Sequence, residues 1–207
     1  MGKLSGKSGR IKLGTSTAIT GATSTNGVTK ISFAAAHGFV VGQFILVKGV
    51  TGMTDLNNGG KGFLISAVAN TAGGTPDYSV SVALTTTQTW ISGGTVQRII
   101  PITDWSMDGS IEAGDSTDSE SGAFKDKIVA GHKEWKGSYS GLDYDGAGLP
   151  PWGDVMAAEF DIDGNNYYSG TAIFTGFKTD VKVVGASAVT MNGTFEGTGE
   201  LTKVKAA

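Results

Sequence analysis

The feature that most constrains the fold is a long alternation near the end of the chain, in the stretch SAVTMNGTFEGTGELTKV. From Val189 to Thr202, apolar residues and glycines fall on odd positions, and threonine, asparagine and glutamate fall on even ones. A period of two is typical of a β-strand that buries one face. Asn192-Gly193 could instead form a tight turn that splits the run into a hairpin. We expect one long strand, because the alternation passes through this pair without a change of phase.

Two earlier stretches show the same pattern. In ITDWSMDGSIE, Trp105, Met107 and Ile111 share one face, and in EWKGSYS, Trp135 and Tyr139 do so. The alternate positions in both stretches are polar or charged. The chain is therefore expected to contain three long strands, each with one apolar and one polar face. The aromatic residues belong to a core, because they are not interleaved with lysine or arginine as in a nucleic-acid stacking platform.

The composition favours an all-β protein with a packed core. Hydrophobic residues make up 39% of the 207 residues, and the 33 glycines with only 4 prolines indicate many turns. There is no cysteine, which excludes disulfides, thiolate zinc sites and a thiol nucleophile. We find no signal peptide and no apolar run long enough to span a membrane. We therefore expect folding in a cytoplasm and no membrane partner.

The chain changes character twice along its length. Residues 15–98 are poor in charge and consist of short apolar segments such as VTKISF, QFILVKGV, GFLISAV and YSVSVAL between turn signals. The segments before and after them have the longer alternating strands. We therefore predict a discontinuous β domain, residues 1–14 and 99–207, with residues 15–98 inserted as a separate outer β domain.

One segment has helical spacing. LPPWGDVMAAEF, residues 149–160, has proline at its start and Trp152, Val155, Met156 and Glu159 at helical intervals. It is predicted to form a short helix that flanks the sheet. The following stretch, DIDGNNYYSG, is predicted to be a hairpin turn.

The net charge of −3 conceals an uneven distribution. The first 14 residues carry four basic and no acidic side chains, whereas residues 100–207 carry 8 basic and 17 acidic ones. Such a basic N-terminal segment is either attracted to the acidic body of another copy or left solvated. The loop AGDSTDSESGAF, residues 113–124, is similarly too polar to pack on its own domain. Contacts with neighbouring subunits are therefore expected from Lys3, Lys7, Arg10, Lys12, Asp115, Asp118 and Glu120.

No motif indicates catalysis or a cofactor. Gly6-Lys7-Ser8 lacks the upstream glycine and strand of a phosphate-binding loop. Asp161, Asp163 and Asn165 fit a turn better than a calcium loop, whose glycine and closing carboxylate are absent. His37 and His132 are the only histidines, and no Gly-x-Ser-x-Gly motif occurs. We expect no enzyme activity, no cofactor and no metal.

The ordered set of stretches resembles the major tail tube protein of long-tailed, non-contractile bacteriophages. The resemblance covers residues 1–14 and about 100–205, and rests on TDWS, the acidic loop, WKGSYSG and the terminal GTFEGTGELT. Residues 15–98 are similar to a small β cassette of phage structural proteins and, more distantly, of ubiquitin-activating enzymes, through His37–Asn57.

The resemblance implies an all-β tail-tube β-sandwich or barrel with one short flanking helix. It implies hexameric rings that stack into a tube, with the polar face of the long strands lining a lumen for DNA. Acidic groups there repel phosphate, although Lys136 departs from a purely acidic wall. The lumen-facing candidates are Asp104, Asp108, Glu112, Glu134, Glu196 and Glu200.

The same resemblance implies the partners and the location. The partners are other copies of the chain, the tape measure, tail terminator and tail tip proteins, and double-stranded DNA that passes without specific binding. The location is the virion tail, assembled in the bacterial cytoplasm. The alternatives are the inner tube protein of a contractile injection system and a carbohydrate-binding or adhesin β-sandwich.

Overall fold

The computed structural model describes residues 10–60, 62–72, 76–115, 127–142, 152–163, 166–180 and 189–205. These residues form thirteen strands and one 3₁₀ helix, η1. In the first half of the chain the elements are β1 (Arg10–Ala18), β2 (Gly21–Thr25), β3 (Val28–Ser32), β4 (Phe44–Thr51), η1 (Thr54–Gly60), β5 (Phe63–Thr71), β6 (Asp77–Ala83) and β7 (Ser92–Pro101). They continue with β8 (Asp104–Asp115), β9 (Lys127–Leu142), β10 (Val155–Asp161), β11 (Tyr167–Asp180), β12 (Thr190–Gly197) and β13 (Thr202–Val204).

All thirteen strands belong to one hydrogen-bonded antiparallel sheet. Twelve of them follow the order β2-β3-β6-β5-β4-β7-β1-β10-β11-β12-β9-β8, and β13 lies off this path and pairs with β11. The sheet curls over its apolar side, because the Trp105 indole of β8 donates to the carbonyl of Asp161 in β10 at 3.0 Å. The predicted all-β class is confirmed, including two of the three predicted long strands, β8 and β9, and the short strands between residues 28 and 83.

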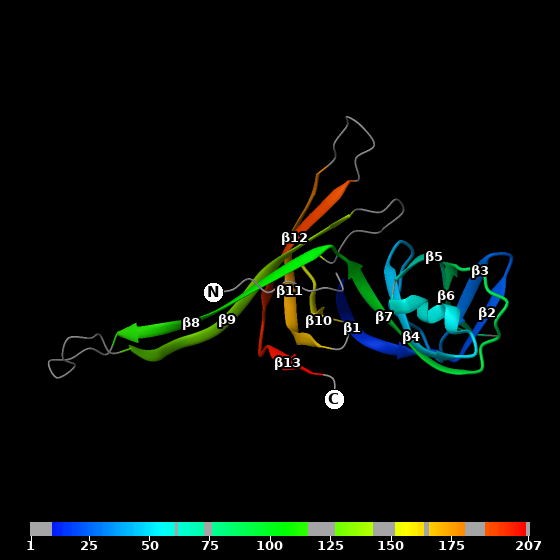
Figure 1. Ribbon diagram of the computed structural model, residues 1–207, viewed down its shortest axis with the longest axis horizontal. Coiled ribbons are helices and arrows are strands. Elements are labelled where there is room, and N and C mark those ends of the chain that lie inside the picture. The colour runs from blue at the N-terminus through cyan, green and yellow to red at the C-terminus, as the bar shows by residue number, and fades with distance from the viewer. Residues whose placement is uncertain are drawn as a thin grey trace.

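Two hydrophobic clusters lie along this path. One, in the inserted lobe, is built from β2 to β7 and includes Ile19 and Val96. The other, in the host lobe, is built from β1 and β7 to β12 and includes Ile11 and Ile100. Strands β1 and β7 therefore pass from one lobe to the other, side by side (Figure 1). The expected boundaries at residues 14 and 98 fall inside these two strands, and the independence of the inserted lobe stays a prediction.

The predicted helix at residues 149–160 is wrong. Its described part continues into strand β10, which pairs with β1 on one edge and β11 on the other. Ala158 and Phe160 are buried and Val155 and Ala157 are exposed, so the burial has a period of two. Although the apolar residues have helical spacing, backbone hydrogen bonds to strands on both edges of β10 favour the extended conformation. The 3₁₀ turn η1 is the only helix among the described residues.

The long terminal strand is interrupted, at a place the sequence did not indicate. It runs through Asn192-Gly193 without a turn, as expected, but β12 ends at Gly197. After a short bend, β13 resumes pairing with β11. The bend lets the carbonyl of Gly199 accept a hydrogen bond from the Trp135 indole at 2.8 Å. The residues from 198 to 201 thus cover an aromatic side chain at the edge of the host core.

Glycines on the apolar face provide room for large rings. A Cβ at Gly193 would collide with the Tyr139 ring, and a Cβ at Gly197 would collide with Trp135. Both glycines sit on β12, next to the strand that carries these rings. The aromatic residues therefore lie flat across the neighbouring strand, which explains why glycines alternate with apolar residues in the sequence.

We predict that Gly197→Ala destabilises the protein strongly. The added methyl group meets the buried Trp135 ring, and overpacking of this kind costs about 1–3 kcal/mol. Gly199→Ala is the matched control, because nothing lies within 4 Å of its Cβ position. Chemical denaturation should show a loss for the first variant and a change within about 0.5 kcal/mol for the second. Equal effects of the two variants would contradict the packing role of Gly197.

We predict that the host lobe folds without the inserted lobe. Ala18 and Thr95 are direct partners in the β1–β7 ladder, so Asn-Gly can replace residues 19–94 as a two-residue hairpin turn. Val96→Thr should accompany the deletion, because Val96 is buried by the inserted lobe. We expect a β-type circular dichroism spectrum and one cooperative melting transition. Aggregation with loss of the β signal would show that the two lobes depend on each other.

Candidate functional site

The most distinctive surface is the polar face of the four adjacent strands β8, β9, β12 and β11. The register places their outward side chains in rows that cross the strands. The first row contains Asp104, Ser140, Asn192 and Lys178. The second contains Ser106, Ser138, Thr194 and Thr175. The third contains Asp108, Lys136 and Glu196, and Ser110 with Glu134 begins a fourth.

The second row is a line of hydroxyl groups. The Oγ atoms of Ser106 and Ser138 are 3.0 Å apart, and the Oγ1 atoms of Thr175 and Thr194 are 3.1 Å apart. Each hydroxyl both donates and accepts, so these side chains satisfy one another across strands. This row therefore offers an uncharged, hydrated surface.

The third row places a lysine between two carboxylates. Lys136 lies directly opposite Asp108 on one neighbouring strand and Glu196 on the other. Directly opposite side chains in a sheet are close enough to interact. Lys136 therefore offsets part of the negative charge, and four carboxylates against two lysines leave the rows weakly acidic.

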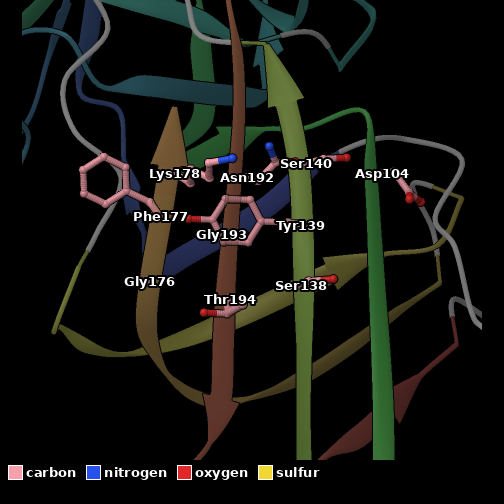
Figure 2. Close-up of a pocket in the computed structure, with 10 residues that line it drawn as sticks. All are labelled: Asp104, Ser138, Tyr139, Ser140, Gly176, Phe177, Lys178, Asn192, Gly193 and Thr194. Atoms are coloured by element: carbon pink, nitrogen blue, oxygen red, sulfur yellow. The ribbon is translucent and has the colours of Figure 1, made fainter. Parts of the chain in front are cut away.

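The face is shallowly hollowed rather than deeply pocketed. A hollow of about 500 Å³ lies over the first two rows, and one of about 310 Å³ lies over the second and third. Figure 2 shows the Tyr139 ring lying across Gly193, with Ser138, Ser140 and Thr194 around it. Among the described residues no group of three or more histidine or carboxylate side chains could hold a metal ion. The arrangement suits broad, weak contact with a polar surface better than tight binding of one ligand.

The structure brings together four of the six lumen-facing candidates. Asp104, Asp108, Glu134 and Glu196 have places in the rows. Glu112 is exposed but lies beyond the rows, where the β8–β9 register shifts. Glu200 follows the end of β12 and lines a different hollow beside Trp135. These placements leave untested whether any of these side chains faces a lumen.

Two of the inter-subunit candidates have partners inside the chain. Arg10 Nε lies 2.5 Å from Asp161 Oδ2, and Lys12 Nζ lies 2.7 Å from Asp161 Oδ1 and 2.8 Å from Glu159 Oε2. Burial alone lowers the pKa of Lys12, but its hydrogen bonds to Asp161 and Glu159 outweigh burial and raise the pKa. This buried cluster joins β1 to β10, and the sequence contained no signal for a pairing over such a separation.

The remaining inter-subunit candidates fall at or beyond the limits of the described chain. Lys3, Lys7, Asp118 and Glu120 lie outside the described residues. Asp115 is the last residue of β8. The inter-subunit role of all seven residues stays a prediction.

Sequence reasoning missed the contribution of β11 to the polar face. Thr175 and Lys178 complete two of the rows, although one is odd and the other even in number. The reason is an irregularity in the β11–β12 register between Phe174 and Gly176, which changes the phase of the alternation. The serine and threonine content of the three long strands was visible in the sequence, but not the alignment of the hydroxyls.

Tyr139 combines burial with an unsatisfied hydroxyl. The residue is 2% exposed, and its hydroxyl has no hydrogen-bond partner among the described residues. Burial raises the pKa of Tyr139 to about 12. The ring packs edge-on against Phe174, with centroids 6.1 Å apart. The ring therefore stabilises the fold beneath the polar face, whereas its hydroxyl does not.

Comparisons with known proteins give little overlap. No protein-family model and no curated protein matches the sequence. Among solved structures, a chain from the tail of an empty GTA particle with C6 symmetry is similar, with 15% identity and a TM-score of 0.37. The similarity covers 48% of this chain and 78% of that chain. An overlap this limited assigns no function. No helix in the described ranges is long and apolar enough to cross a membrane.

We predict that Tyr139→Phe raises stability at neutral pH. The change keeps the ring and removes an unpaired buried hydroxyl, which is worth about 1 kcal/mol. The folded-state pKa is raised above the ordinary value of 10.0 to about 12, so the wild type loses stability as the pH rises from about 10 to 12. The variant should lose less over that window in denaturation experiments. A destabilised variant at pH 7 would show that the hydroxyl has a partner.

Proposed function

We propose that the protein is a structural virion protein that polymerises as stacked rings into the tail tube of a long-tailed, non-contractile bacteriophage. The proposed role is mechanical, as a conduit for DNA, and not enzymatic. One observation carries the proposal: among the described residues, no strand pairs with either outer edge of the four-stranded sheet that carries the polar face, and we call these two edges free.

The first free edge is β8, which ends the path formed by the described strands. The second is the upper part of β11. Strand β10 pairs with β11 only from Tyr167 to Ile173, whereas β12 pairs with it up to Asp180. The last backbone contacts on the β10 side are Gly153 N to Phe174 O at 2.9 Å and Phe174 N to Asp154 O at 3.4 Å. Beyond Phe174 the described chain places no strand on this edge.

Unpaired edges of this length are a liability for an isolated chain, since they template pairing with other chains. The four strands alternate in direction, so β8 runs antiparallel to β11. A second copy related by rotation can therefore place its β8 against β11 of the first in an antiparallel pair. Head-to-tail contacts of this kind generate closed rings, and closure removes the edges.

The polar face then becomes the wall of a lumen. Hydroxyl groups and a small excess of carboxylates give a hydrated surface that releases no counterions from DNA, so phosphate is not retained. A wall of this kind suits passage better than binding. We propose that six copies close each ring.

If the polar face lines the lumen, the position of the inserted lobe and the partners of the protein follow. The inserted lobe lies on the far side of the host lobe from the end of the β8–β9 hairpin (Figure 1), and we assign it to the outside of the tube. The proposed partners are further copies, the tape measure, tail terminator and tail tip proteins, and passing double-stranded DNA. The proposed location is the virion tail, after assembly in the host cytoplasm.

We predict that the purified chain forms rings or tubes at high concentration. Negative-stain microscopy and sedimentation over a hundredfold concentration range are the measurements. A central channel and a fixed ring size are the expected result, because each added copy offers the same free edge until the ring closes. A chain that stays monomeric over the whole range would contradict the proposal.

We predict that reversing charge in the third row slows DNA passage. Asp108→Lys with Glu196→Lys makes that row entirely cationic, and each added cation neutralises phosphate and releases counterions. Particles carrying the variant should have tails of normal length and eject DNA slowly, more so at low salt. Val40→Lys with Val41→Lys is the control, because it adds two cations at exposed sites of the inserted lobe, away from the rows. Normal ejection by the double variant would exclude this face as the lumen wall.

A further inference from the structure

The host lobe exposes large apolar side chains at two places in its described part. Ile111 on β8 is 42% exposed, and beside β11 Trp152 is 66% exposed and Val155 is 61% exposed. The two places lie at the two free edges of the four-stranded sheet. Both exposed places are explained if, in an assembly, one place on each copy covers the other place on the next copy.

The place on β8 is a groove. Strand β9 pairs with β12 only as far as Lys136, so beyond that point the described part of the chain places no strand beside the hairpin on this edge. We call residues 109–115 of β8 and 127–135 of β9 the arm, which projects from the sheet in Figure 1. At its base lies a hollow of about 540 Å³, lined by Ile111, Trp135 and Leu201. Lys133, Glu134 and Glu200 also line it.

The place beside β11 is a projecting side chain, Trp152, which we call the knob. The Trp152 ring packs edge-on against Phe177, with centroids 6.0 Å apart. The next residue, Gly153, donates its backbone N–H to Phe174. The indole is thus held at the start of the free edge of β11 while most of it faces solvent. Asp154 follows on the same exposed segment.

Barrel geometry brings the knob and the groove of different copies together. Four strands at ~4.8 Å spacing span roughly 19 Å. With the strand tilt of about 35–45° found in barrels, the next copy is offset along the strands by roughly 13–19 Å, or about 4–6 residues.

The register then identifies the neighbour. Phe177 lies in line with Gly193, Tyr139 and finally Trp105 on β8. An offset of about 4–6 residues places Gly109 to Ile111 of the next copy opposite Phe177. An offset in the other direction would run off the start of β8 at Asp104. The arm is therefore the part of β8 that a tilted ring requires, and its base carries the groove.

We propose that Trp152 of each copy packs into the groove formed by Ile111, Trp135 and Leu201 of the next copy. The inference rests on the proposed ring assembly and adds the contact that sets the stagger between copies. Trp is one of the side chains enriched at the energetic centres of protein interfaces, where it fills a pocket on the partner.

Cross-linking tests the contact directly, because the chain has no cysteine of its own. Lys133→Cys with Asp154→Cys in one chain keeps Trp152 and the groove intact, because Lys133 is the register partner of Ile111 and both replaced side chains are exposed. Treated with a short bis-maleimide under assembling conditions, this pair should give a ladder that ends at the ring number. The control pair is Thr103→Cys with Asp154→Cys, which samples the unstaggered position. Within one chain the two sites of the first pair are separated by about six residues along the strands, roughly 20 Å, so a bridge between copies is expected.

Each outcome decides between the two proposals. A ladder from the first pair alone supports the staggered contact. Rings or tubes that form without that ladder, or with an equal ladder from the control pair, overturn it and leave ring assembly intact. Wild-type chains that never assemble overturn both.

A second variant gives an independent measure. Trp152→Ala should raise the concentration needed for assembly at least tenfold, with an unchanged melting temperature, because the side chain is mostly exposed in the single copy. Val41→Ala, at an exposed site of the inserted lobe, is the control. Assembly of Trp152→Ala at the wild-type concentration would overturn the inference.

Discussion

The structure depends on large aromatic rings lying flat against glycines of the neighbouring strand. Tyr139 covers Gly193 and Trp135 covers Gly197, and in the opposite direction Phe195 leaves no room for a Cβ at Gly137. Each ring thereby buries area on two strands at once and fixes their register. One thin layer of side chains is then enough for a core, and the other face of the same strands is free to be polar.

The two lobes are joined by strands that they share. Strand β7 contributes to both clusters, and β1 leads from Ile11 and Leu13 in the host cluster to Ile19, just past its end, in the other. The inserted lobe therefore continues the host sheet and is not attached by a linker. The buried cluster of Arg10, Lys12, Asp161 and Glu159 ties β1 to β10 at the start of this shared ribbon. A buried ion cluster contributes little net stability, but leaving one member unpaired is strongly unfavourable. It therefore specifies which strand lies beside β1.

The proposed assembly follows from what the single chain leaves incomplete. In the part of the chain that the structure describes, one sheet has a polar face, two free edges and an arm that extends past its last neighbouring strand. Edge pairing, the stagger of a tilted barrel and the exposed Trp152 are three separate features that a head-to-tail ring brings together. A monomeric β-sandwich has no need for any of them.

The sequence by itself determined the strand faces, because a period of two depends only on local backbone geometry. It identified the aromatic positions of the core, the four carboxylates that share the polar face, and the change of character near residues 15 and 98. It misjudged the segment around Val155, where helical spacing and strand alternation overlap and only the ladders on both sides decide between them. Only the tertiary structure decided which hydroxyl groups line up in a row and which carboxylates, Glu112 and Glu200, lie outside the rows of the polar face. It alone also decided the pairing of Lys12 with Asp161. Bulges change which side chains align, and contacts between distant parts of the chain leave no trace in a local pattern.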